Sequence, residues 1–403
     1  MINIAVLGYG VVGSGVVEVI GRNHEEVSRK AGEEVRVRYI LDLRDFPGDP
    51  YEDRIIHDFN TILNDPEIAI VCEVMGGTGA AYQFTRQLLE AGKSVCTSNK
   101  ELVAKHGAEF LELAAARHCN YMFEASVGGG IPIIRSVNTA LTAEKIESVT
   151  AILNGTTNYI LTRMAGEGAD YGQALKQAQE LGYAERNPEA DVEGYDACRK
   201  LAILSSLIKG KNVDAGQIYT EGITGITGAD FEYARMEGLV IKQLAIGKME
   251  EDGSVLAMVA PFLLSEEHPL AAVNDVFNAV LVTGNMLGDV IFYGRGAGKL
   301  PTASAVVADV IDCAKHRGKN VICIWDREAA KAADVTDTKR RFFLRAKADT
   351  RKAVEETFAG GKSITLPGVE NEFGFFTREL EEKDFDAKCK SMGDAVLNRI
   401  RLL

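Results

Sequence analysis

The first twenty residues constrain the fold most, because an apolar stretch, INIAVL, runs directly into the glycine pattern GYGVVG and then into an amphipathic helical stretch. Gly8, Gly10 and Gly13 hold the three glycine positions of a G-x-G-x-x-G turn. In such a unit the first glycine makes a tight turn, the second admits a pyrophosphate, and the third lets the helix approach the strand. The diphosphate then lies at the helix N-terminus, which here begins with Val11 and Val12. The start of the chain therefore predicts a dinucleotide-binding unit.

The end of the expected second strand, VRVRYILDL, bears on the choice of dinucleotide. Asp42 would bind the adenosine ribose hydroxyls of NAD, whereas Arg44 would attract the 2′-phosphate of NADP. Because the chain carries both residues, NAD and NADP both remain open.

Two later stretches repeat the pattern of an apolar strand, a glycine or polar loop, and a helix: IAIVCEVMGGTGA and SVCTSNKELVA. This alternation predicts an α/β fold with a doubly wound parallel sheet of the Rossmann type. Ligands bind such sheets at the strand ends, where Thr97, Ser98 and Lys100 fall.

The pattern of apolar, glycine and polar residues changes along the chain, which suggests several domains. The length of 403 residues also suggests more than one domain. We expect a nucleotide-binding domain over residues 1–125, completed by about 301–330. An α+β domain over 126–300 is inserted between these parts. The polar stretch 331–339 is typical of a linker, and 340–403 predicts a small βαββαβ module.

Bulk composition narrows the class of protein. The net charge of −13 argues against nucleic-acid or anionic-membrane partners, and no apolar run is long enough to span a bilayer. Seven scattered cysteines without a C-x-x-C pair indicate reduced thiols in the cytoplasm. The six histidines are equally dispersed, so no transition-metal site is expected.

The stretch DVEGYDACRKLAILSSLIKG, residues 191–210, predicts a buried helix that carries a charged pair on its apolar side. Lys200 points between leucines, and Asp196 lies one turn before it. The pair is either a structural ion pair or part of a catalytic site, and the helix alone does not decide between them. Three other polar side chains of the helix are expected to reach water: Arg199, Ser206 and Lys209.

Six ordered blocks of the sequence together resemble the homoserine dehydrogenase family over essentially the whole chain. The blocks are GYGVVGSGV (8–16), TSNKELVAKHG (97–107), EASVGGGIPII (124–134), LNGTTNYIL (153–161), LGYAERNPEADVEGYDACRKLAIL (181–204) and GRGAGKLPTASAV (294–306). The resemblance implies reversible, NAD(P)-dependent interconversion of L-homoserine and L-aspartate 4-semialdehyde. It also implies that 126–300 serves catalysis and dimerisation, in a homodimer or homotetramer.

The resemblance assigns roles to individual residues. Lys200 matches the catalytic lysine of the family, and Lys100 matches the lysine of its NK motif, which we also expect to be catalytic. Lys100 could polarise the reacting oxygen, bind the substrate carboxylate or neutralise charge near the nicotinamide, and the sequence does not separate these roles. The substrate-binding acids match Glu185, Asp191 and Asp196. Further cofactor contacts fall on Gly182 and Gly298. A Na⁺ site built from loop carbonyls falls on Glu124, Val127, Gly129 and Ile131.

Residues 340–403 resemble the ACT regulatory module that often follows this enzyme. Their first loop, KADTRKAVEE, lacks the Pro-Gly turn of such ligand loops, so effector binding and a packing role both stay open.

Two other interpretations of the function of the whole chain also remain. One is another NAD(P)-dependent amino-acid or semialdehyde dehydrogenase, and the other is a silent NAD(P)-binding regulator.

Overall fold

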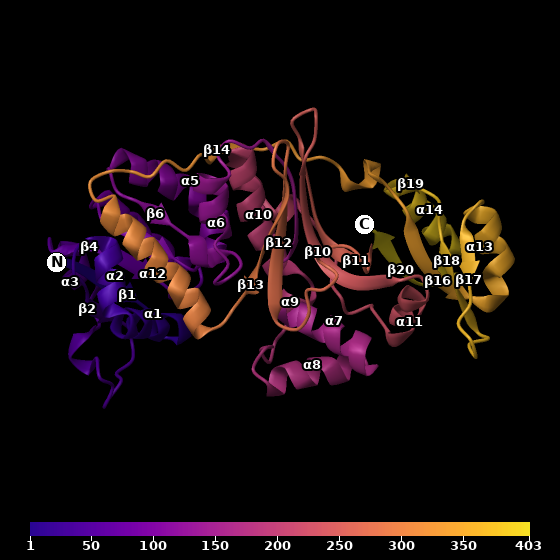
Figure 1. Ribbon diagram of the computed structural model, residues 1–403, viewed down its shortest axis with the longest axis horizontal. Coiled ribbons are helices and arrows are strands. Elements are labelled where there is room, and N and C mark those ends of the chain that lie inside the picture. Colours follow the sequence, from indigo (N-terminus) through magenta and orange to yellow (C-terminus); the bar gives the residue numbers. More distant parts are fainter.

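The computed structural model describes residues 1–403 as an elongated molecule with three parts in a row (Figure 1). An N-terminal sheet with its helices lies at one end, a long central sheet lies in the middle, and a small C-terminal module lies at the other end. The N-terminus lies at the outer end of the first part. The C-terminus lies inside the molecule, where the module meets the central sheet (Figure 1).

The N-terminal sheet is parallel and has the strand order β3-β2-β1-β4-β5-β6. Its strands are β1 (Ile2–Leu7), β2 (Val35–Leu41), β3 (Ile55–Ile56), β4 (Ile68–Glu73), β5 (Ser94–Thr97) and β6 (Tyr121–Met122). Its helices are α1 (Val11–Arg22), α2 (His24–Ala31), α3 (Phe59–Asn64), α4 (Gly79–Glu90) and α5 (Lys100–Ala116). All six residues of β1 are buried, as expected for an apolar central strand covered on both faces. The predicted doubly wound sheet is confirmed.

Helix α12 (Lys299–Lys315) returns to the N-terminal sheet after the central part of the chain. It packs against α1 at Gly15, where an added Cβ would lie 2.9 Å from the carbonyl oxygen of Lys299 and 3.0 Å from Ala303. Two helices can approach this closely only because glycine has no side chain.

The central sheet is built mainly from long antiparallel strands that follow a short helix, α6 (Ile133–Arg135). Its strands are β7 (Ile146–Ile152), β9 (Tyr219–Thr220), β10 (Leu239–Met249), β11 (Val255–Ser265), β12 (Phe277–Gly284) and β13 (Gly288–Arg295), and a short strand, β8 (Lys211–Asn212), follows its longest helix. Its helices are α7 (Gly155–Glu167), α8 (Tyr171–Glu180), α9 (Glu189–Val192), α10 (Tyr195–Lys209) and α11 (Gly228–Met236). This mixture of sheet and helices confirms the predicted α+β part.

Helix α10 lies between α5 and the strands β10 and β11, so it is covered on two sides. Its apolar residues belong to one continuous core that joins the N-terminal and central sheets. This position explains a wrong expectation, because Ser206 is fully buried and does not reach water. Its hydroxyl accepts a hydrogen bond from the backbone N–H of Val213 at 2.9 Å.

The C-terminal module has the predicted order βαββαβ. Its elements are β16 (Phe342–Lys347), α13 (Arg351–Thr357), β17 (Lys362–Ile364), β18 (Glu372–Phe376), α14 (Glu382–Met392) and β20 (Val396–Leu402). Short strands precede it and lie within it: β14 (Asp326–Ala329), β15 (Lys339–Arg340) and β19 (Leu380–Glu381).

The module is not a separate body joined by a free linker. Strand β20 pairs with β16 on one side and with β11 on the other, so the central and module strands form one sheet of ten strands. Part of the expected linker is docked as well, since Val335 is buried against the central sheet. No helix combines the length and the apolar character needed to cross a membrane.

Candidate active site

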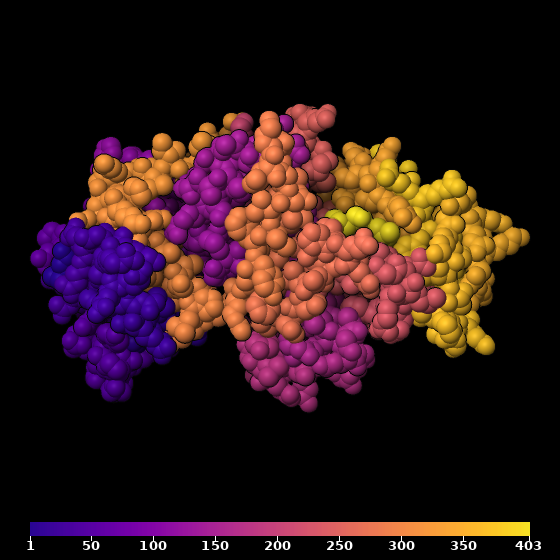
Figure 2. Space-filling view, in the orientation of Figure 1, coloured from indigo at the N-terminus to yellow at the C-terminus, as the bar shows by residue number.

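A cleft of about 660 Å³ lies between the N-terminal and central parts of the molecule. Figure 2 shows a notch between the indigo N-terminal lobe and the magenta helices α7 and α8. The predicted site residues that line this cleft are Val11, Val12, Ser98, Lys100, Gly129, Gly182, Glu185, Asp191, Asp196, Lys200 and Gly298. The fold thus brings residues from all six of the sequence blocks that carry the resemblance to one cleft. The block 153–161 contributes Asn154, Gly155 and Thr156, none of which had been singled out.

The glycine turn has the local geometry that its pattern predicts. Gly8 has a φ of +93°, which favours glycine, and an added Cβ at Gly13 would lie 1.9 Å from the carbonyl oxygen of Gly8. An added Cβ at Gly10 would meet nothing within 4 Å, so this position opens onto free space. Gly8 needs glycine for the turn and Gly13 needs it for packing, whereas Gly10 leaves room for a ligand.

The start of α1 adds hydrogen-bond donors to this open space. No side chain caps the helix, and the backbone N–H groups of Val11, Val12 and Gly13 donate to no protein acceptor. Helix α12 likewise begins without a side-chain cap, at Gly298. Two helix N-termini with free N–H groups therefore face one cleft, which suits a ligand with negative charge.

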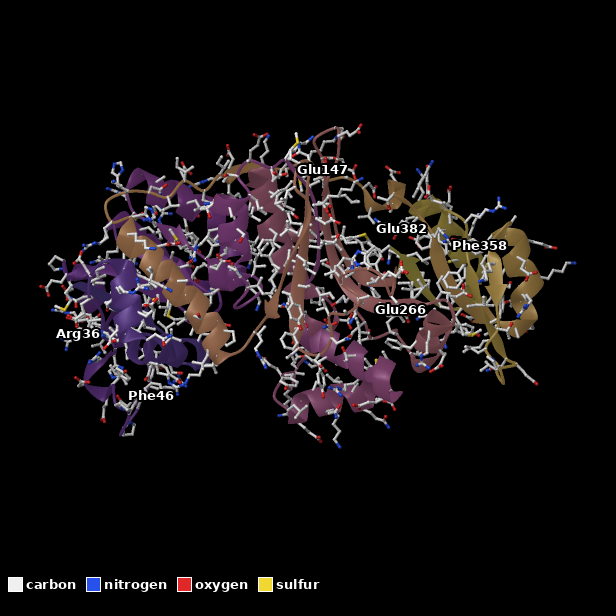
Figure 3. All side chains as sticks on the ribbon, viewed as in Figure 1. Arg36, Phe46, Glu147, Glu266, Phe358 and Glu382 are labelled. Atoms are coloured by element: carbon white, nitrogen blue, oxygen red, sulfur yellow. The ribbon has the colours of Figure 1, made fainter.

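Asp42 and Arg44 form a pair in the structure. Arg44 donates to Asp42 from Nε at 3.0 Å and from Nη2 at 3.1 Å, and the backbone N–H of Tyr9 donates to the same carboxylate at 2.8 Å. The hydrogen bonds from Arg44 hold the pKa of Asp42 well below its usual range. Arg44 is 64% exposed and lies over Phe46, labelled in Figure 3, at the edge of the N-terminal lobe.

A buried carboxylate between two lysines forms the centre of the cleft. Asp196 accepts from the Nζ of Lys200 at 2.7 Å and from the Nζ of Lys100 at 2.8 Å. Lys200 also donates to the carbonyl oxygen of Leu153 at 2.7 Å. Lys200 is 10% exposed and Lys100 is 40% exposed. The structure thus contains the ion pair of Lys200 and Asp196 that the helix pattern predicts, and this pair lines the cleft.

Asn154 completes this cluster and was missed by sequence reasoning. Its Nδ2 donates to Asp191 at 2.7 Å and to Asp196 at 2.9 Å. Its Oδ1 accepts from the backbone N–H of Thr157 and caps α7. The sequence LNGTT contains the signal for the cap, but the two carboxylates reach Asn154 only through the tertiary fold.

The charges in the cluster set the ionisation of its members. Burial acts to raise the pKa of Asp196, but the ammonium groups of Lys200 and Lys100 outweigh it and hold that pKa well below its usual range. The Asp196 carboxylate raises the pKa of Lys100. Burial and the nearby Asp196 charge raise the pKa of Asp191. Asp196 is therefore firmly ionised, while Asp191 holds its charge less tightly.

The other predicted substrate and cofactor residues take different positions. Glu185 and Gly182 lie on an exposed loop between α8 and α9 that borders the cleft, and the Glu185 carboxylate has no protein partner. Thr97 lies below the cleft surface, where its hydroxyl donates to Glu73 at 2.7 Å. Ser98 lines the cleft directly, just before Lys100 begins α5.

The predicted cation loop is buried beside the cleft. The carbonyl oxygen of Glu124 accepts from Val127 at 3.4 Å, and that of Ile131 accepts from Ile133 at 2.9 Å. The carbonyl oxygens of Val127 and Gly129, both buried, accept no hydrogen bond from the protein. The Glu124 carboxylate points elsewhere and accepts from two backbone N–H groups at the start of α6.

None of the seven cysteines lines the cleft, so the structure offers no nucleophilic thiol for a phosphorylating aldehyde dehydrogenase. The glycine turn and the two ammonium groups share one cavity. The fold and the site therefore define an NAD(P)-dependent oxidoreductase.

Comparison with known proteins identifies the family. The family model described as homoserine dehydrogenase matches residues 132–311, and the model described as the NAD binding domain of homoserine dehydrogenase matches residues 8–124. A homoserine dehydrogenase of Synechocystis sp. is 46% identical over 320 residues, which cover 77% of this chain and 73% of the relative. The chain belongs to the homoserine dehydrogenase family.

Solved structures agree with this assignment. The crystal structure of a homoserine dehydrogenase from Thiobacillus denitrificans superposes with a TM-score of 0.89 at 35% identity, and it covers 100% of this chain and 98% of that one. A hyperthermophilic archaeal homoserine dehydrogenase in complex with NADPH gives a TM-score of 0.65 at 28% identity, covering 77% and 97%. The protein acts on the CH–OH group of homoserine and interconverts homoserine with aspartate 4-semialdehyde.

Proposed function

We propose that Lys200 is the proton donor to the substrate oxygen when aspartate 4-semialdehyde is reduced. An ammonium has three N–H donors, and Lys200 uses two of them on Leu153 and Asp196. The third donor remains for a ligand in the cleft. This geometry carries the proposal, because it fixes the ammonium while leaving one proton free.

The chemistry that NAD(P)H supplies when bound is a hydride for the aldehyde carbon. The carbonyl oxygen gains negative charge at that point, and the Lys200 ammonium stabilises the charge and transfers a proton to the oxygen. In the oxidation of homoserine the neutral Lys200 amine accepts the hydroxyl proton. Asp196 holds the ammonium in place from one helical turn away.

Lys100 has a different setting, which supports a separate role. It donates only to Asp196 and is more exposed than Lys200, so two of its donors remain. We propose that Lys100 binds the substrate carboxylate beside the catalytic ammonium. The substrate ammonium is bound by Asp191 and Glu185, whose carboxylates face the same cleft.

The residues of the glycine turn fit a bound dinucleotide. Gly10 leaves space for the pyrophosphate, and the free N–H groups of Val11 and Val12 donate to it. Gly182, Gly298 and Ser98 line the cleft and complete the contacts around the nicotinamide end. Thr97, buried beneath them, accepts from the N–H of Asn99 and supports this loop from below.

Arg44 supports a preference for NADP with NAD tolerated, since its guanidinium is exposed at the end of β2. The NADPH bound to the archaeal relative agrees with this preference.

The buried carbonyls of Val127 and Gly129 support a structural Na⁺ site. Two carbonyl oxygens without donors in a buried loop suit a hard monovalent cation. Glu124 and Ile131 supply the other two carbonyl ligands of the proposed site.

We also propose the division into domains 1–125 with 301–330, 126–300 and 340–403. A homo-oligomer is supported by the outer strand β13, on which Ile291 is 43% and Tyr293 is 56% exposed. The seven free cysteines support a cytoplasmic location.

The roles of the carboxylates can be tested with two substrates. Succinate semialdehyde lacks the ammonium of aspartate 4-semialdehyde, so wild-type enzyme should strongly prefer the amino acid. Asp191→Asn and Glu185→Gln should reduce this preference while leaving the affinity for NADPH unchanged. An unchanged preference in both variants would show that other groups bind the ammonium.

A further inference from the structure

Arg401 joins the C-terminal module to the central domain through a buried guanidinium. The residue lies on β20 and is 1% exposed. Its Nε donates to Glu382 at 2.8 Å, its Nη1 to Glu221 at 2.7 Å, and its Nη2 to the hydroxyl of Tyr219 at 2.9 Å. Glu382 belongs to the module and is labelled in Figure 3 at this junction. Glu221 and Tyr219 belong to the central domain, so one side chain bonds to both parts.

Glu221 lies in a short connector, which we define as residues 219–224. The connector is pressed against a turn, defined as residues 192–194. The N–H of Ile223 donates to the carbonyl oxygen of Val192 at 2.9 Å. An added Cβ at Gly222 would lie 2.6 Å from the same oxygen. The connector and the turn are therefore in contact with no room between them.

The turn lies in the sequence between the two proposed substrate-binding acids, Asp191 and Asp196. Asp191 precedes it, and Asp196 follows it in the first turn of α10. Gly194, at the start of α10, has a φ of +85°, and an added Cβ there would meet Thr220 at 3.1 Å. The path from the guanidinium to the substrate acids thus consists of direct contacts, first with the connector and then with the turn.

We propose that Arg401 is a positioning residue of the substrate site. Its ion pair with Glu221 fixes the connector, and the connector fixes the turn that sets the spacing of Asp191 and Asp196. This inference rests on the proposed substrate-binding role of those two acids. The family models end at residue 311, well before Arg401. The C-terminal module thus supports the substrate site from a distance, and none of its residues lines the cleft.

A second buried arginine of the module provides a matched control. Arg345 on β16 lies 3.3 Å from Asp230 of α11 and 3.4 Å from Glu372. The pair of Arg345 and Asp230 also joins the module to the central domain. Asp230 accepts further hydrogen bonds from Thr227 and Asn398, which lie outside both the connector and the turn. Loss of this pair weakens docking of the module without releasing the substrate acids.

The test compares Glu221→Gln with Asp230→Asn in the full chain. Glu221→Gln keeps the shape of the side chain and removes its charge, so the connector loosens while the fold remains. We expect the KM for homoserine to rise about 3- to 30-fold, the usual scale for coupling carried through packed contacts. The KM for NADP⁺ and kcat should change less than about 2-fold. Asp230→Asn should lower the melting temperature and leave the KM for homoserine unchanged.

Arg401→Lys provides a graded second variant. Lysine keeps the charge, but its donors all lie on one nitrogen, whereas the guanidinium reaches Glu382, Glu221 and Tyr219 from three different nitrogens. It should raise the KM for homoserine less than Glu221→Gln does. The proposal is wrong if Glu221→Gln lowers the melting temperature but keeps a wild-type KM for homoserine. Asp191→Asn distinguishes a failure of the proposed substrate role of Asp191 from a failure of the positioning role of Arg401. A wild-type KM in that variant overturns the proposed substrate role, whereas a raised KM there with no effect of Glu221→Gln overturns only the positioning role.

Discussion

Replacing Lys200 with methionine separates a catalytic lysine from a structural one. Methionine keeps the apolar stem of the side chain and removes the ammonium, so packing among the leucines of α10 is preserved. Asp196 keeps its bonds to Lys100 at 2.8 Å and to Asn154 at 2.9 Å. The buried carboxylate therefore does not become an unpaired charge.

The expected change in stability is small. The variant loses two charge-assisted hydrogen bonds, each contributing about 1.5–3 kcal/mol. Removing a nearly buried ammonium offsets this loss, since its desolvation costs several kcal/mol. We therefore expect the free energy of unfolding to change by no more than about 3 kcal/mol, within the ~5–15 kcal/mol that a folded domain has.

The expected change in rate is large. Loss of a positioned general acid lowers kcat by roughly 10²- to 10⁴-fold, which corresponds to about 3 to 5 kcal/mol in the barrier. NADPH oxidation with aspartate 4-semialdehyde, followed at 340 nm, measures this directly. The dissociation constant of NADPH should not change, because the glycine turn lies elsewhere. Lys209→Met on the same helix is the control and should keep wild-type kcat. If Lys200→Met turns over at a rate near that of wild type, Lys200 is structural and the proposed proton donor is wrong.

Five further perturbations test other parts of the site. Asp196→Ala leaves two ammonium groups without their carboxylate, so urea unfolding should show that the free energy of unfolding falls by about 3–5 kcal/mol. The KM for homoserine should rise in a kinetic assay. A smaller loss of stability than in Lys200→Met would contradict this expectation. The pKa of Asp196 is lowered in the folded state, so its ionisation stabilises the fold above the unfolded pKa of about 3.9. This stabilisation is lost as pH falls through the folded pKa. The difference in free energy of unfolding between wild type and Asp196→Asn should therefore narrow in acid. Arg44→Ala should raise the KM for NADP⁺ far more than that for NAD⁺, and equal changes would show that Arg44 does not bind the 2′-phosphate. Gly10→Val should abolish NADPH binding with an unchanged melting temperature, because the added side chain occupies open space. Replacing Na⁺ by a bulky organic cation should lower the melting temperature, whereas no change would argue against the carbonyl site at Val127 and Gly129.

The parts of the fold that could be predicted from the sequence are those with local signals. The glycine turn is written in six consecutive residues, and the burial of β1 follows from an unbroken apolar run. The ion pair of Lys200 and Asp196 follows from helical spacing, because residues four apart share a face. For these features the sequence neighbours are also the spatial neighbours.

The parts that could not be predicted depend on distant residues. Ser206 was expected to reach water because one face of α10 is polar, but the helix is covered on both sides. Asn154 carries a helix-cap signal, and nothing near it in sequence indicates that it also bonds Asp191, 37 residues away. The ion pair of Arg401 and Glu221 joins residues 180 apart. Periodicity has no information about such pairs.

The place of β20 has a consequence for any attempt to remove the C-terminal module. This strand lies inside the ten-stranded sheet, between β11 and β16, and not at its edge. Deleting residues 340–403 would therefore expose the edge of β11 at Phe262 and Leu263, which β20 now covers. An exposed apolar edge strand is a template for pairing with other chains. The shortened protein should self-associate with its cleft intact, so a loss of activity on truncation would report aggregation and not the loss of a regulatory signal.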